Sequence, residues 1–144
     1  MRLGQAAFAF AAIGTAIVVA AFAVPQAEPS LITIPNLVAQ HAAFDGKTVR
    51  VRGFLSQCAD ENCALTSAPY DGRNLRAWHD RGGRLLSIGA DPAFDQQTAG
   101  FANRAVVIRA RFRDDCLRPQ TLCSDRAPTL QPLGRHSLIP DEEI

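Results

Sequence analysis

Residues 44–54 read FDGKTVRVRGF and residues 104–113 read RAVVIRARFR, and these two stretches decide the fold. In both, apolar and polar side chains alternate, which is the period of a strand with one face against a core and the other toward solvent. The core-facing set consists of Val49, Val51, Gly53, Val106, Ile108, Ala110 and Phe112. The two stretches therefore predict two long amphipathic strands at the centre of a mostly β domain.

Weaker patterns on either side supply the remaining elements. Pro35 suits the first turn of a helix, which predicts a short helix over 35–43. The Asp91-Pro92 pair predicts the capped start of a further helix that ends near Phe101. Additional strands are expected over 64–67, 75–79 and 85–88, and a last one over 129–133 or 136–139. After the short first helix, the order is then β-β-β-α-β-β.

This order is that of the five-stranded OB barrel. Residues 44–54, with a turn at Asp45-Gly46 and the alternation that follows, resemble the opening strand of small exported bacterial OB-type domains. Ala77-Trp78 and residues 106–112 resemble the third and fourth strands of that group, so the resemblance extends over residues 34–139. It implies a small five-stranded OB-like barrel preceded by a short N-terminal helix, with no assigned activity to carry over. A different small β-barrel or sandwich fits the same pattern.

The N-terminal segment has the composition of a secretory leader. Met1-Arg2 gives a short positive region, residues 6–24 are apolar or small, and Ala21-Phe22-Ala23 gives small residues for cleavage. Residues 1–23 are therefore predicted to be a cleaved signal peptide. An uncleaved inner-membrane anchor is the alternative, because the apolar run is long enough to span. The expected divisions are a lead-in over 24–33, the domain over 34–139 and an acidic tail over 140–144, all periplasmic or secreted.

The four cysteines are Cys58, Cys63, Cys116 and Cys123. They form two local pairs with C-x4-C and C-x6-C spacing, whereas thiolate zinc sites favour C-x2-C pairs. The spacing and the expected oxidising compartment together favour two disulfides. Of the three possible pairings, the local one is the simplest. In the OB interpretation both pairs lie in loops that flank the usual ligand face, so crossed pairing between these loops stays open.

The net charge of the chain is close to zero, with 15 basic and 14 acidic residues. Removing the leader removes Arg2 and no acid, so the 15 basic residues become 14, equal to the 14 acidic ones. A balanced charge argues against a polyanion partner for the molecule as a whole. A local patch is still predicted, because the two long strands are neighbours in an OB barrel. This candidate anion-binding face consists of Arg50, Arg52, Arg109, Arg111 and Arg113. The alternative is a solvated face balanced by acids such as Asp114 and Asp115.

Three aromatic residues, Phe54, Tyr70 and Trp78, are candidates for a ligand face, although Trp78 also suits a core or rim position. His79 and Asp80 have the chemistry of acid–base catalysis, but adjacent residues on a strand point to opposite faces. The sequence contains no nucleophile elbow, no metal-ligand spacing and no nucleotide-binding loop. No catalytic residue, metal or cofactor is therefore predicted.

The sequence is interpreted as an exported, non-catalytic binding or accessory module of the cell envelope, whose ligand the residues do not identify. Its expected partner is another envelope protein or an anionic glycan or lipid surface. Nucleic acid is not expected as a ligand, because export would separate the protein from cellular nucleic acid and because few aromatic residues are available to stack on bases. The alternatives are a small periplasmic enzyme or metal-dependent protein, and a purely structural envelope component.

Overall fold

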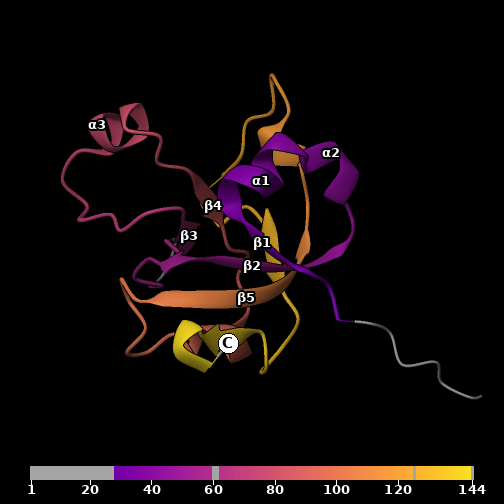
Figure 1. Ribbon diagram of the computed structural model, residues 1–144, viewed down its shortest axis with the longest axis vertical. Coiled ribbons are helices and arrows are strands. Elements are labelled where there is room, and N and C mark those ends of the chain that lie inside the picture. The colour runs from indigo at the N-terminus through magenta and orange to yellow at the C-terminus, as the bar shows by residue number, and fades with distance from the viewer. Residues whose placement is uncertain (1–27, 60–61, 125, 144) are drawn as a thin grey trace, which may run out of the picture.

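Residues 28–59, 62–124 and 126–143 are described by the computed structural model shown in Figure 1. The predicted signal peptide over 1–23 lies outside these residues, as does the acidic pair Asp60-Glu61. Every helix within the described residues is too short, or not apolar enough, to cross a bilayer.

Strands β2 (Thr48–Leu55) and β5 (Ala105–Phe112) form the centre of the sheet, as the sequence predicts. They pair antiparallel over seven residue pairs. The predicted alternation is confirmed, because the core-facing positions of both strands are buried while Arg52 and Arg109 are exposed. Gly53 lies among the buried positions. The residue there must be glycine, because a Cβ would lie 2.8 Å from the carbonyl oxygen of Thr66.

Short strands extend each side of this central pair. β1 (Leu31–Thr33) runs parallel to the first half of β2, and β3 (Ala64–Thr66) pairs antiparallel with its end. In the same way β6 (Leu130–Pro132) pairs with the end of β5, and β7 (Leu138–Pro140) with its beginning. β4 (Leu85–Ser87) extends the sheet beyond β3. The described residues thus form one seven-stranded sheet with the main order β4-β3-β2-β5-β6.

The sheet remains open and has seven strands, so it does not form the five-stranded barrel that the sequence predicts. Its two edges, β4 and β6, approach each other, but a single parallel bridge between Ile88 and Leu130 joins them. The backbone N–H of Gly89 donates to the Leu130 carbonyl at 2.9 Å. The ladder ends there because both edge strands are three residues long and Pro132 has no N–H to donate.

Helices α1 (Ile34–Ala39) and α2 (His41–Phe44) confirm the short helix predicted over 35–43, although Gln40 divides it in two. Pro35 lies in the first turn of α1, where its missing N–H costs nothing. Ile34 and Leu37 are fully buried, so α1 packs on the core-facing side of the sheet.

Helix α4 (Pro92–Asp95) begins at the predicted cap but ends well before Phe101. Asp91 Oδ1 accepts two backbone N–H groups of the first turn, at 2.9 and 3.0 Å. Thr98 closes the helix, because both its N–H and its hydroxyl donate to the last helical carbonyl. Phe94 on this short helix is fully buried in the core.

Residues 75–79 are helical, which corrects the predicted third strand. Helix α3 (Leu75–Asp80) starts after Asn74, whose side-chain oxygen accepts a first-turn N–H at 2.9 Å. The segment between β3 and β4 projects away from the sheet, so no neighbouring strand is available to pair with it (Figure 1). Trp78 is 5% exposed, and its indole N–H donates to the Pro69 carbonyl at 3.2 Å.

Two disulfides, Cys58–Cys63 and Cys116–Cys123, confirm the simplest pairing and leave no thiolate for a zinc site. The Cα atoms lie 4.2 and 5.7 Å apart. Cys63 packs in the core, whereas Cys123 is exposed. Both bonds indicate an oxidising environment of the extracellular or periplasmic kind.

Candidate functional site

The predicted arginine face lies on the outer side of β2 and β5. Arg50 is directly opposite Arg109 in the antiparallel ladder, and Arg111 is opposite Thr48. Directly opposed side chains on one face have Cβ atoms about 5 Å apart, and like charges in that position destabilise the pair. The strand register therefore brings together arginines that lie about 60 positions apart in the sequence. This confirms the prediction that the two long strands are neighbours.

Acidic groups neutralise part of this face. Glu28 accepts a bond from Arg50 Nη1 at 3.0 Å, and Asp141 accepts Arg52 Nε at 3.0 Å. Arg113 contacts Asp115 at 2.9 Å through Nη2. The predicted alternative, a strand face balanced by acids, thus describes Arg50, Arg52 and Arg113. Asp114 does not pair with these arginines, because it contacts His41 and Arg118 instead.

The two exposed arginines of β5, Arg109 and Arg111, are not neutralised by the described residues, and Arg50, which pairs with Glu28, lies beside them. Within residues 28–59, 62–124 and 126–143, no acidic side chain forms an ion pair with Arg109 or Arg111. Arg50 is only 19% exposed at its side chain, and its buried Nε has no hydrogen-bond partner among the same residues. We call Arg50, Arg109 and Arg111 the cationic patch.

The backbone beneath the patch is firmly held. The N–H of Arg109 donates to the Ser137 carbonyl at 2.7 Å, and Ser137 Oγ accepts the Leu133 N–H at 2.6 Å. These bonds fix the loop between β6 and β7 against β5, with Arg135 and His136 exposed on it. The guanidinium groups therefore project from a rigid ladder, which lowers the ordering cost of binding an anion.

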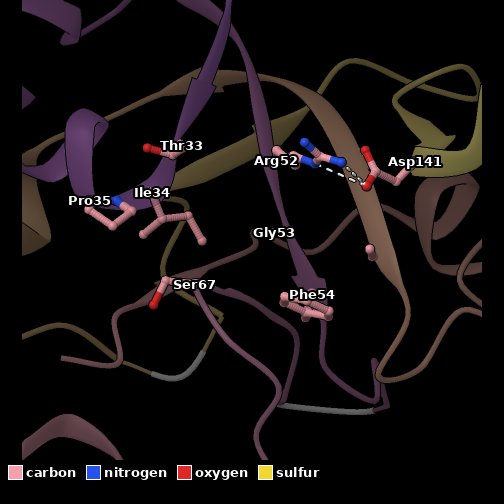
Figure 2. Close-up of a pocket in the computed structure, with 9 residues that line it drawn as sticks. Thr33, Ile34, Pro35, Arg52, Gly53, Phe54, Ser67 and Asp141 are labelled. Carbon is pink, nitrogen blue, oxygen red and sulfur yellow. Dashed lines mark hydrogen bonds and ion pairs between the residues drawn. The ribbon is translucent and has the colours of Figure 1, made fainter. Parts of the chain in front are cut away.

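A cavity of about 230 Å³ lies beside this face, at the end of β2 (Figure 2). Ile34 and Pro35, from the start of α1, line one side, and Arg52 and Phe54 line the other. Figure 2 shows that the Arg52 guanidinium points to Asp141 rather than into the cavity. Because the ion pair engages the charged groups, this cavity offers few polar contacts to a ligand.

The three candidate aromatics divide into two places. Tyr70 and Trp78 form a tilted ring pair with centroids 5.3 Å apart, in the segment between β3 and β4. Phe54 lines the separate cavity at the end of β2. The predicted set of three aromatics is therefore not gathered in one place, because α3 carries Trp78, together with Tyr70, away from Phe54.

His79 and Asp80 do not form a catalytic pair. His79 Nδ1 lies 2.9 Å from the Gly83 carbonyl, and consecutive residues on a helix do not face each other. Among the residues that the structure describes, no three His, Cys, Asp or Glu side chains gather closely enough to hold a metal ion.

A polar cluster that sequence reasoning missed joins α2 to the segment after β5. Asp114 is 2% exposed, and its Oδ2 lies 3.0 Å from His41 Nδ1. Arg118 Nη2 lies 2.5 Å from Asp114 Oδ1. The Arg118 guanidinium, and after it the His41 ring, hold the pKa of Asp114 below its usual value. No hydroxyl or thiol of the described residues bonds to His41, so the cluster lacks a nucleophile and is interpreted as structural.

Replacing Asp114 with asparagine is expected to flatten the dependence of stability on acid pH. The folded-state pKa of Asp114 is lowered, so its charge contributes stability that is complete above the unfolded pKa and is lost as pH falls through the folded pKa. Urea unfolding from about pH 7 to about pH 2 measures the slope. Asp80→Asn, at an exposed carboxylate, is the matched control. Parallel curves for Asp114→Asn and the unmodified chain would contradict this role.

Comparison of the chain with protein-family models, with curated proteins and with solved structures found no match. The function is therefore inferred from the geometry of the surface itself.

Proposed function

We propose that this chain is an exported, non-catalytic binding module that holds an anionic component of the cell envelope on the cationic patch. One observation carries the proposal: Arg109 and Arg111 have no acidic partner among the described residues, and Arg109 lies directly opposite Arg50. Glu28 balances the charge of Arg50, so the uncompensated charge of this face is that of Arg109 and Arg111. Like charges opposed on neighbouring strands are unfavourable, and a bound anion would balance them.

The chemistry of the patch favours carboxylate or phosphate groups. A guanidinium presents planar N–H donors that match these anions in pairs. Arg50 and Arg109 lie about 5 Å apart at Cβ, and Arg111 is one strand repeat further along β5, at about 7 Å. This row fits a polymer or surface with repeating anionic groups better than a single small anion.

The strand order supports an OB-type origin for this surface. OB folds are partly open Greek-key barrels, and the β4-β3-β2-β5-β6 order with the Ile88–Leu130 bridge follows that arrangement. The two disulfides support a periplasmic or secreted location, in line with the predicted leader over 1–23. A binding module is a common use of such a domain.

The Arg109→Ala/Arg111→Ala double variant is expected to bind polyanions at least about tenfold more weakly, because each charge-assisted hydrogen bond contributes about 1.5–3 kcal/mol. Polygalacturonate and long-chain polyphosphate serve as carboxylate and phosphate probes. Calorimetric titration at about 50 and 200 mM salt gives affinities, which should fall steeply with salt for the unmodified chain.

The matched control is Arg76→Ala/Arg84→Ala, which removes the same charge from exposed arginines outside the patch. It should keep the affinity within about twofold, as expected for screened, distant charges. Equal losses in both double variants, or no binding of either polymer by the unmodified chain, would overturn the proposal.

A further inference from the structure

We infer that Arg52 is a further anion-binding residue of the face that carries the cationic patch, and that Asp141 occupies its guanidinium until a ligand displaces it. This role rests on the proposed function, since it concerns the regulation of polyanion binding at the same face. Asp141 is the first residue of η2 (Asp141–Glu143), a short 3-10 helix that follows β7. A carboxylate of the chain itself thus holds the place of one anionic group of the ligand.

Arg52 extends the cationic patch along β2. It lies two residues after Arg50, so the two side chains leave the same face of the strand about 7 Å apart. In the ladder Arg52 is opposite Val107, which makes it the diagonal neighbour of Arg109, at about 7–8 Å. The three guanidinium groups therefore lie within reach of one flexible polyanion.

Asp141 binds Arg52 as a ligand anion would, but through one oxygen only. Nε and Nη2 of Arg52 both donate to Oδ2 of Asp141, the Nε bond at 3.0 Å (Figure 2). Among the described residues, no hydrogen bond engages Oδ1 of Asp141. A phosphate or carboxylate that presents two oxygens to the same N–H groups forms the stronger, bidentate arrangement. A ligand anion can therefore compete with Asp141 for Arg52.

Displacing Asp141 costs little, because the contacts that hold η2 lie at the surface. The Arg52 side chain is 54% exposed, and the second pair, Arg104 Nη2 with Glu142 Oε1 at 2.9 Å, is exposed on both sides. An exposed ion pair shifts an equilibrium by up to about fivefold. The Asp141 side chain is only 15% exposed, so its release returns a desolvated carboxylate to water and offsets part of the lost attraction.

Asp141→Asn should therefore raise the affinity for polyanions about three- to fivefold, by freeing Arg52 for the ligand. The slope of log affinity against log salt counts the anionic groups that a protein neutralises, at about 0.7–0.9 per contact. One additional contact should steepen the slope by this amount. Calorimetric titration with polyphosphate and polygalacturonate between about 50 and 200 mM salt measures affinity and slope, and circular dichroism verifies that the variant is folded.

Arg52→Gln added to Asp141→Asn should return the slope to that of the unmodified chain, because the freed guanidinium is then missing. The matched control is Asp71→Asn, which removes one carboxylate and frees Arg73, its partner at 3.9 Å on the segment between β3 and β4. This control should keep the affinity within about twofold and leave the slope unchanged, since the charge is distant and screened.

An unchanged slope in Asp141→Asn would overturn this role of Arg52, and so would a steeper slope that persists in Arg52→Gln/Asp141→Asn. In either case polyanion binding by the unmodified chain still supports the cationic patch, so the two failures are distinguishable. Binding of neither polymer, by the unmodified chain or by Asp141→Asn, would overturn both the role of Arg52 and the proposed function.

Discussion

Phe112→Ala is expected to lower the free energy of unfolding by about 3–5 kcal/mol, the usual range for removing a large aromatic ring from a packed core. Phe112 is fully buried at the end of β5, opposite Leu130 of β6. Its backbone N–H donates to the Lys47 carbonyl and its carbonyl accepts the Gly46 N–H, both at 2.9 Å. Three segments therefore meet around this ring, and none can move inward to fill the space without breaking these bonds. Urea unfolding followed by circular dichroism measures the loss.

Phe101→Ala provides the comparison for this prediction. Phe101 is half-buried, and Arg104 lies over its ring at 5.3 Å from the centroid. Because its surroundings are open to water, truncation should cost less than half as much as at Phe112. Similar losses at both positions would contradict the greater burial of Phe112 in the core.

The long strands could be predicted because their signal is local and repeated. Each of β2 and β5 extends over eight residues with alternating burial, so several side chains report the same period. The start of α4 could also be predicted, because Asp91 and Pro92 are adjacent residues that are typical of a helix N-cap and first turn. Where one residue pair or one cap carries the whole signal, sequence reasoning succeeds only if that cap is recognised.

The third predicted strand shows how such recognition fails. Residues 75–79, which read LRAWH, are too few for their pattern to separate a strand from a helix. Asn74 decides the outcome by capping the first turn of α3. Short length also explains why the arrangement of the sheet edges was not predicted. Five strands are only three residues long. Whether such strands close a barrel depends on tertiary contacts such as the Ile88–Leu130 bridge.

The candidate sites follow the same division. Strand register put Arg50 beside Arg109 once the two long strands were taken as neighbours. The acids that pair with Arg50 and Arg52, Glu28 and Asp141, come from opposite ends of the described chain. His41 and Asp114 are 73 residues apart, and no local pattern connects them. Long-range pairing of polar groups carries no periodic signal, so it had to be observed.

Removing the Cys58–Cys63 disulfide is expected to cost about 3–5 kcal/mol of unfolding free energy, and removing Cys116–Cys123 about 2–3 kcal/mol. The two bonds close loops of similar length, with sequence separations of 5 and 7, so their effects on the unfolded chain are nearly equal. The difference comes from the folded state. Cys63 is 3% exposed and packs in the core, so a serine there buries a hydroxyl without a designed partner. Cys123 is exposed, and serine at that position is solvated.

Urea unfolding of Cys58→Ser/Cys63→Ser and Cys116→Ser/Cys123→Ser measures both losses, and Cys58→Ala/Cys63→Ala separates the hydroxyl from the lost crosslink. Equal losses in the two serine variants would show that Cys63 contributes nothing beyond loop closure.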